Sequence, residues 1–274
     1  MLAHPDDESF GPGGTLALYA QRGVANYLVC ATRGELGEAP PDLRGYASIA
    51  EMREAELRCA GQVLGLKEVH FLGYRDSGMA GSPDNAHPNS FGSAPLDETA
   101  RKVARHMREI RPQVVITFDP HGGYGHPDHI AAHRATVAAL PMAGDPQVDI
   151  AGLPPYAPPK LYYHTFPRDW LRWAVRLLPL FGADPRHFGK NRDLDLVEVL
   201  AGSLPVHASI SIRSVADVKE RASACHVSQG GGMPRGPLAW LMRLASSKDQ
   251  YTRAVPVEPP QRVEHDLFDG VGGE

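Results

Sequence analysis

Short apolar runs alternate with longer amphipathic stretches along the first 166 residues, and this alternation most restricts the fold. The apolar runs are rich in β-branched and aromatic residues, as buried strands are, and they cover 25–32, 69–74 and 113–119. Stretches with helical spacing lie before and between them, at 14–23, 49–66 and 96–112. Strand–helix–strand repetition favours a doubly wound sheet. We therefore predict an α/β fold, with a Rossmann-like, mostly parallel sheet flanked by helices and a C-terminal extension.

The pattern becomes less regular after residue 166. A further strand is expected at 160–166, another at 206–212, and a helix capped by Ser214 after it. Prolines and terminal glycines after residue 252 indicate a loose end. The chain is therefore predicted to divide into a catalytic core (1–166), a part that completes the fold and covers the pocket (167–252), and a loose tail (253–274).

Composition excludes several function classes. A net charge of −4 provides no basic face for nucleic acid. No stretch reaches the ~18 apolar residues of a membrane span, and the nearest one, 169–182, contains two arginines and Pro179. Cys30, Cys59 and Cys225 are odd in number and far apart, which favours reduced, buried thiols and a cytoplasmic protein.

The chain begins MLAHPDDESFGPGG, with one histidine and three acidic residues directly before a glycine-rich turn. Acidic side chains this close repel one another unless a positive charge lies among them. The motif therefore indicates a cation. Only Met1 and Leu2 precede it, so either the first strand is very short or the numbered chain lacks part of its natural start.

A second polar motif, DPHGGYGHPDHIAAH at 119–133, follows the predicted strand at 113–119. Ligands bind beyond the carboxyl ends of parallel strands, so the two motifs are expected to meet there. Histidine and aspartate ligands with an open position are typical of catalytic zinc. His4 and Asp7 are three residues apart, and His126 and His129 have the same spacing. An open site uses three of these four candidates as ligands. One histidine is then left to act as an acid in the reaction.

AHPDDE at 3–8, together with GGYGHPDH at 122–129, resembles the LmbE/PIG-L family of zinc-dependent N-acetylglucosaminyl deacetylases. The likeness is greatest to members that serve mycothiol and bacillithiol synthesis and to the related mycothiol-conjugate amidases. It covers about residues 2–140 and includes YRDSGM at 74–79. Beyond residue 167 it is weak, although KERASACHVSQ at 219–229 resembles a C-terminal stretch common in these enzymes.

The resemblance implies roles for the motif residues. His4, Asp7 and His129 would bind the metal. Asp6 would be the general base, and His126 would stabilise or protonate the intermediate.

It also implies roles for the residues around this centre. Asp128 would orient and tune the imidazole of His126, and Tyr124, on a glycine-flanked loop, would reach the substrate carbonyl. Three residues are assigned to the substrate side: Arg53, Asp76 and Glu8. For Glu8, a helix cap or a supporting position behind the ligands is the alternative.

These residues suit amide hydrolysis. Zinc lowers the pKa of its bound water to about 7, a neighbouring carboxylate can accept the proton, and a tyrosine or imidazolium can stabilise the negative oxygen. We therefore predict a zinc-dependent deacetylase, a hydrolase of linear amide C–N bonds. Its substrate would be a small N-acetyl amino sugar or its conjugate, and Fe²⁺ is the alternative metal.

Other functions use overlapping features. An amidase acting on a mycothiol-type S-conjugate would share the chemistry and differ at the pocket rim, where we expect the polar insertion 74–92. Two histidines and a carboxylate also suit a non-haem iron oxygenase, but Asp6 and His126 supply hydrolytic acid–base groups. GPGG is not GxGxxG, which argues against nucleotide binding. A non-catalytic, metal-retaining scaffold stays open, as does a homo-oligomer formed through 169–182.

Overall fold

The computed structural model describes residues 1–165, 168–182, 184–187, 195–202, 204–232 and 247–271. Its strands are β1 (Asn26–Cys30), β2 (Leu66–Phe71), β3 (Val114–Phe118), β4 (Lys160–Thr165), β5 (Ala208–Ser211) and β6 (Lys248–Val255). Its helices are α1 (Asp7–Phe10), α2 (Gly13–Gln21), α3 (Ile49–Leu64), α4 (Leu96–Ile110), α5 (Gly122–Gly125), α6 (Pro127–Gly144), α7 (Arg168–Leu177), α8 (Leu196–Ala201) and α9 (Ala216–Cys225). Short 3₁₀ turns lie at Pro83–Ala86, Phe91–Ser93, Leu178–Phe181, Arg213–Val215 and Val227–Gln229.

The strands form two sheets, a parallel pair and a mixed sheet of four strands. β1 pairs in parallel with β2, and β3 pairs in parallel with β4. β6 lies antiparallel between β4 and β5. The first residues of the chain join the two groups of strands, because Leu2 bridges Cys30 in parallel and the amino group of Met1 donates to Ile116 O at 2.7 Å. The predicted α/β class with a parallel-containing sheet is confirmed.

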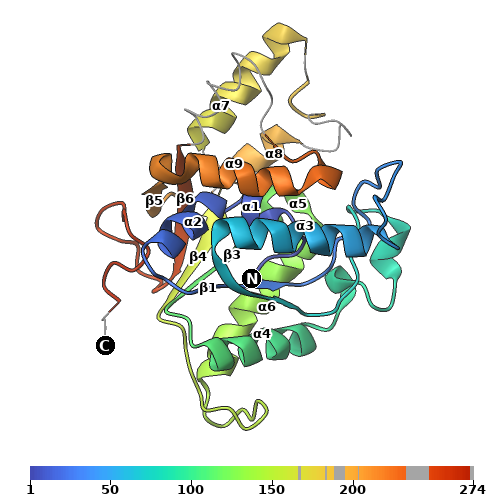
Figure 1. The fold of residues 1–274 in the computed structure, drawn as a ribbon. Helices are drawn as coiled ribbons and strands as arrows, with labels where there is room; N and C mark the ends of the chain where they lie inside the picture. The colour runs from blue at the N-terminus through green and yellow to red at the C-terminus, as the bar shows by residue number, and fades with distance from the viewer. Residues whose placement is uncertain (166–167, 183, 188–194, 203, 233–246, 272–274) are drawn as a thin grey trace.

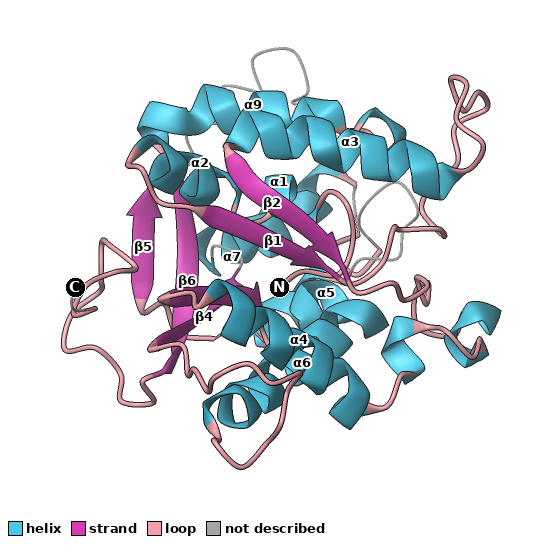
Figure 2. Cartoon of the chain, turned by 60° about the horizontal axis from the view of Figure 1, so that its bottom comes forward, coloured by secondary structure: helices cyan, strands magenta, loops and turns pink. Residues whose placement is uncertain are grey.

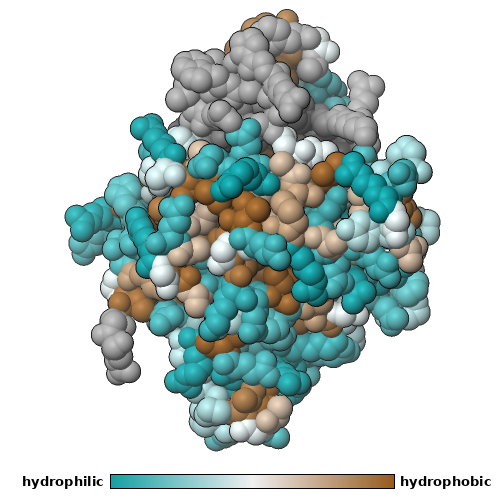
Figure 3. All heavy atoms as spheres, in the orientation of Figure 1, coloured by the Kyte–Doolittle hydropathy of each residue, from teal (hydrophilic) through white to brown (hydrophobic). Residues whose placement is uncertain are grey.

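Helices cover both faces of this sheet. Figure 2 shows α2, α3 and α9 on one side and α4 and α6 on the other, and the pairs α3–α9 and α4–α6 pack together. α7 extends beyond α8 and α9 at the top of Figure 1. Apolar side chains gather toward the middle of the face drawn in Figure 3, with polar ones around them. None of the described helices is long and apolar enough to cross a bilayer.

Helix α3 illustrates how local sequence sets an element. Ser48 caps its start, because the side chain accepts a hydrogen bond from Glu51 N. The helix buries Met52 and Leu57 on one face. It ends at Gly65, which takes the left-handed conformation (φ 74°). The predicted helical stretch at 49–66 is thus confirmed.

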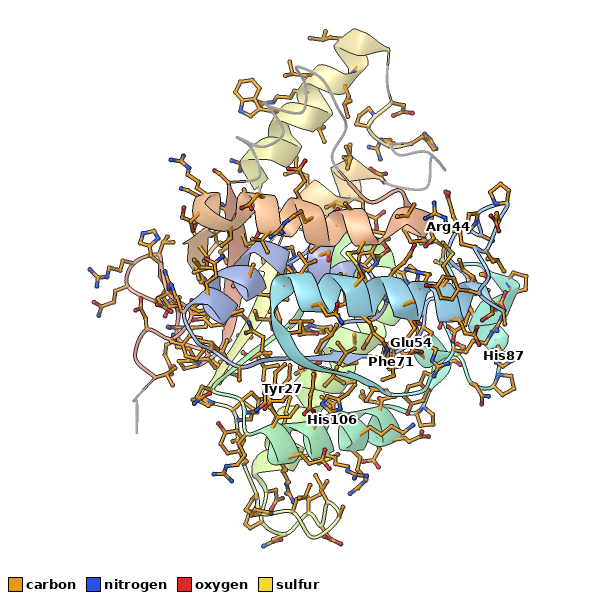
Figure 4. All side chains as sticks on the ribbon, in the orientation of Figure 1. Tyr27, Arg44, Glu54, Phe71, His87 and His106 are labelled. Carbon is orange, nitrogen blue, oxygen red and sulfur yellow. A yellow bond between two sulfur atoms is a disulfide. The ribbon has the colours of Figure 1, made fainter. Side chains whose placement is uncertain are left out.

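A cavity of about 530 Å³ lies between β1 and β3, at the edge where these strands begin. Its lining is mostly apolar and includes Leu28, Val114 and Leu267. Tyr27 and His106, labelled in Figure 4, also line it. The second polar motif follows the other end of β3, and none of the candidate metal ligands lines this cavity.

The predicted loose tail is wrong for much of 253–271. Residues up to Val255 belong to β6, and Leu267 is buried. The Glu264 carboxylate lies 3.2 Å from Lys160 Nζ and 2.6 Å from Arg253 Nη1. These partners are distant in sequence, so prolines and glycines alone could not reveal the packing. The predicted boundary between a core and a C-terminal part stays a prediction.

The cysteine prediction is also wrong in part. Cys59 of α3 and Cys225 of α9 form a disulfide, with their Cα atoms 5.9 Å apart and a sequence separation of 166. Cys30 is a buried free thiol, as expected. Because two of the three cysteines are bonded, the cysteines no longer indicate a reducing compartment.

Candidate metal centre

The two polar motifs meet at the carboxyl end of the sheet. Residues 3–8 turn from the Leu2 bridge into α1, and residues 119–129 turn from β3 into α6. Tight backbone turns make this approach feasible. Asp6 has φ 113°, and Gly122, Gly123 and Gly125 have φ of 65°, 70° and 89°. Positive φ is accessible to glycine but costly for aspartate.

The three predicted ligands converge on one point. His129 Nε2 lies 3.3 Å from both His4 Nδ1 and Asp7 Oδ1, and His4 Nδ1 lies 3.7 Å from Asp7 Oδ2. Ligand atoms about 2.0–2.1 Å from one tetrahedral ion are about 3.3–3.4 Å from each other. The two contacts of His129 Nε2 have this spacing, whereas the 3.7 Å from His4 Nδ1 is measured to Oδ2, the second carboxylate oxygen of Asp7. The arrangement is compatible with one divalent ion between the two imidazoles and Asp7.

Outer hydrogen bonds orient both imidazoles toward this point. His4 Nε2 lies 3.1 Å from Asp128 Oδ2, and His129 Nδ1 lies 3.1 Å from Gly122 O. A carboxylate or carbonyl oxygen only accepts, so these ring nitrogens are the donors. In the neutral form of each ring, His4 Nδ1 and His129 Nε2 then have lone pairs that face the centre, the arrangement found around metal-bound histidines. Burial lowers the pKa of His4, but Asp128, Asp76 and Asp7 raise it well above its usual value, so a metal at this point would displace a proton from the ring.

Asp7 is held as a carboxylate. Its Oδ2 accepts from the backbone N of His4 at 2.7 Å and of Ala3 at 3.2 Å, while Oδ1 faces His129. Burial raises the pKa of Asp7, but His129 and His4 lower it by more, so that it lies well below its usual range. A deprotonated carboxylate is the form that binds a metal.

His126 lies in the same cluster. Ring nitrogens of His4, His126 and His129 are all within 4.8 Å of one another. His126 Nδ1 accepts from Asp128 N at 3.2 Å and so caps α6. Burial and the two neighbouring imidazoles lower the pKa of His126 to about 3. The neutral ring therefore carries its proton on Nε2, where it can be donated.

Asp128 is placed differently from the expectation. Its carboxylate accepts from His4 Nε2 and also from Ser77, from the backbone N at 2.9 Å and from Oγ at 2.5 Å. Only its backbone N reaches His126. The residue therefore orients His4. Sequence reasoning missed Ser77, although it lies inside the YRDSGM motif.

Asp6 and Arg53 are paired beside the centre. Arg53 Nη2 lies 3.1 Å from Asp6 Oδ2 and donates to Pro5 O at 2.6 Å, while Nη1 donates to Gly34 O at 2.8 Å. Arg53 is only 3% exposed, so it binds protein groups in place of the expected sugar. Burial raises the pKa of Asp6 to about 6, although Arg53 opposes the shift.

Asp76 and Glu8, also assigned to the substrate, are buried. Asp76 Oδ1 lies 3.7 Å from His4 Nε2 and accepts from Gly78 N at 2.8 Å. Glu8 is 0% exposed, and His226 Nε2 lies 2.7 Å from its Oε1. Neither carboxylate is open to a substrate here. Sequence reasoning gave His226 no role, although KERASACHVSQ contains it.

Tyr124 lies at the edge of the cluster. Its ring centroid is 5.1 Å from that of His129 and 6.1 Å from that of His126, with both rings met edge-on. It is carried by the glycine-rich turn α5. This position is compatible with the expected role at a substrate carbonyl.

Comparison with known proteins adds independent information. Residues 1–140 match the family described as "PIG-L: GlcNAc-PI de-N-acetylase". A Thermomonospora curvata protein named 1D-myo-inositol 2-acetamido-2-deoxy-α-D-glucopyranoside deacetylase is 45% identical over 195 residues, which are 68% of this chain and 64% of that protein. A protein of the same name from Acidothermus cellulolyticus is 41% identical over 83% of this chain and 77% of its own length.

The chain spans less than two thirds of several relatives. The matched share is 64% for the T. curvata protein, 55% for one from Kineococcus radiotolerans and 66% for one from Thermobifida fusca. Among solved structures, the conserved protein TT1542 from Thermus thermophilus has a TM-score of 0.60 at 25% identity and 96% and 97% coverage of the two chains. N,N'-diacetylchitobiose deacetylase from Pyrococcus horikoshii also has a TM-score of 0.60, at 18% identity and 98% and 85% coverage, and so shares the fold.

Proposed function

The chain belongs to the PIG-L family, and from this premise we propose that it is a metal-dependent hydrolase that removes the acetyl group from an N-acetylglucosamine-type substrate. One observation carries the proposal. His129 Nε2 lies 3.3 Å from His4 Nδ1 and from Asp7 Oδ1, and the outer nitrogen of each imidazole is held by an acceptor. This arrangement supports a metal site in a chain that belongs to a family of de-N-acetylases.

Zinc is the proposed metal, with Fe²⁺ as the alternative, because two neutral imidazoles and one carboxylate suit either ion. A bound divalent ion would supply Lewis-acid activation of water and of the amide carbonyl. The residues proposed to hold it are His4, Asp7 and His129. Asp128 and Gly122 would keep the two imidazoles in the binding tautomer.

The proposed roles in hydrolysis follow from the positions of the polar groups. Asp6 accepts the proton of the attacking water, and its pKa of about 6 suits a base at neutral pH. The Nε2–H of His126 donates a hydrogen bond to the developing oxyanion, while the proton that Asp6 takes from the water passes to the departing amine. Tyr124, carried by the glycine-rich turn α5, is a further donor.

For the substrate, the relatives' names suggest a 2-acetamido-2-deoxy-glucopyranoside linked to inositol as the first compound to test. A mycothiol-type S-conjugate is the second compound, because its amide would be cleaved by the same groups. The two differ in the part remote from the scissile bond, so the relative kcat/KM for the two compounds decides between them.

The test combines metal analysis with product analysis. The purified protein is loaded with Zn²⁺ or Fe²⁺, and acetate and free amine are measured for a panel of N-acetyl amino sugars and conjugates. We expect about one ion per chain and stoichiometric acetate and amine. Oxygen consumption without acetate would instead support the oxygenase alternative. Metal binding without turnover of any compound would support a scaffold.

A further inference from the structure

We propose that His226, which follows α9, is a positioning residue for Asp6 and acts through the carboxylate of Glu8. The inference rests on the proposed function, in which Asp6 is the base. His226 comes from a part of the chain more than 200 residues away from Asp6, where the family match does not extend. The C-terminal region would then help to position the proposed catalytic base.

Hydrogen bonds connect His226 to Asp6 through Glu8. His226 Nε2 lies 2.7 Å from Glu8 Oε1, and Glu8 Oε2 accepts from Asp6 N at 3.0 Å. Ser9 Oγ donates to Glu8 Oε1 at 2.5 Å. His226 and Glu8 are both 0% exposed, so water does not replace either partner.

Asp6 needs such support because its backbone is strained. Its φ of 113° and ψ of −30° lie outside the regions that residues other than glycine favour, at a cost of about 1–3 kcal/mol. Its peptide is held on both sides: Glu8 accepts from its N, and its O accepts from Ser9 N at 3.0 Å and Phe10 N at 2.9 Å. The same strained turn directs the Asp6 carboxylate to Arg53.

His226 adds a side-chain donor to the buried carboxylate of Glu8, beside Ser9 Oγ and Asp6 N. A buried carboxylate without a strong donor is costly. The described surroundings of His226 are the edge of the Phe10 ring, at 5.9 Å between centroids, and the acidic groups of Glu8, Asp6 and Glu56. Burial lowers the pKa of His226, but these carboxylates, Glu8 first, raise it above the usual value. The Nδ1 of His226 is buried and has no hydrogen-bond partner among the described residues, so the contact of Nε2 with Glu8 is the one that holds the ring.

The segment that carries His226 is fixed against α3. Cys225 is bonded to Cys59, and Ser228 donates to Glu56 through its backbone N at 2.8 Å and its Oγ at 2.6 Å. Gly231 N donates to His226 O at 2.8 Å. The imidazole is thus rigidly placed, as positioning requires.

Three variants test the proposal. His226→Leu removes the donor, whereas His226→Gln keeps an N–H near the place of Nε2. Ser228→Ala is the matched control, because it removes a buried hydrogen bond to a glutamate from the same segment without touching Glu8. Misplacing a catalytic group by about 1 Å can cost about 100-fold in rate. We therefore expect His226→Leu to lower kcat 10- to 100-fold at unchanged KM and metal content.

The conservative variant and the control should behave differently. His226→Gln is expected to recover most of kcat, and Ser228→Ala to lose stability while keeping kcat. In crystal structures, we expect His226→Leu alone to move the Asp6 peptide and break its contact with Arg53. If His226→Leu does not fold, Glu8→Gln, which replaces one acceptor oxygen by a donor, takes its place with the same expected result.

Two outcomes overturn the inference: normal kcat in His226→Leu, or an Asp6 peptide that is unmoved in its structure. Failure of the proposed function is distinguishable, because it would show as an inactive wild-type protein. The crystal structures would still decide in that case whether His226 places Asp6.

Discussion

His4 Nε2 lies 3.1 Å from Asp128 Oδ2, and this contact determines which nitrogen of His4 faces the candidate metal centre. The carboxylate accepts a hydrogen bond from Nε2–H of His4. In the neutral ring, Nδ1 then has the lone pair and points to His129 and Asp7. Asp128 is in turn held by Ser77. Asp128 thus lies next to the proposed metal ligand His4 without being a proposed ligand itself.

Asp128→Asn should therefore weaken metal binding by about 10- to 100-fold, since outer partners of metal-bound histidines have effects of this size. Competition with a chelating dye measures the affinity. Ser77→Ala is the graded control, because it removes one donor from Asp128 and leaves the contact with His4; a smaller loss is expected. Equal affinity for wild type and Asp128→Asn would contradict the assigned tautomer.

His129→Ala and Asp6→Asn should separate binding from turnover. His129→Ala removes a central donor atom and is expected to abolish bound metal after dialysis. Asp6→Asn keeps the shape of the turn but cannot accept a proton, so metal content should stay normal while kcat falls by about 100-fold or more. Metal analysis and acetate release on the same samples measure both. Normal hydrolysis by Asp6→Asn would reject the base assignment.

Arg53→Met should destabilise the fold. Arg53 donates to two backbone carbonyls in addition to its contact with Asp6, and a methionine would leave all three acceptors without it. Breaking a buried pair costs about 3–5 kcal/mol. Because the Asp6 side chain is 17% exposed, we expect about 3 kcal/mol. Urea unfolding measures it; a variant with Arg58→Met, whose partner Glu54 is on the helix surface, should lose less than about 1 kcal/mol.

The disulfide predicts a redox-dependent stability. A crosslink that closes a loop of 166 residues restricts the unfolded chain, which the chain-entropy account values at about 5 kcal/mol. The double variant Cys59→Ser/Cys225→Ser should therefore unfold at lower urea than the oxidised wild type, and both proteins should unfold alike in reducing agent. Alkylation followed by intact mass measurement checks the bond. Three alkylated thiols in the oxidised wild type would contradict it.

The sequence predicts strands close to β1–β5, the helical stretch 49–66 and the meeting of the two motifs, because these depend on local spacing and on a general rule for parallel sheets. It does not predict β6, part of which lies in the expected loose tail. It does not predict the Cys59–Cys225 bond, the packing of Glu264 or the contact of His226 with Glu8. Each of these joins residues that are far apart along the chain, so no local pattern encodes them. Asp128 shows a subtler limit: its importance was predicted, but the choice between His126 and His4 depends on how α6 faces the first turn.

The pair formed by His226 and Glu8 should make stability depend on pH in a defined direction. The folded state raises the pKa of His226 above the ordinary value of about 6.5, so its proton is bound more tightly in the folded than in the unfolded chain. The stabilisation is then fully present below about pH 6.5 and is lost as the pH rises through the folded-state pKa. Urea unfolding of wild type and His226→Gln, with matched metal content, should give a larger difference in unfolding free energy at pH 6 than at pH 9. For Ser228→Ala, which removes no titrating group, the difference from wild type should be the same at both pH values. A difference for His226→Gln that is independent of pH, or that grows toward pH 9, would show that the imidazole is not held as the cationic partner of Glu8.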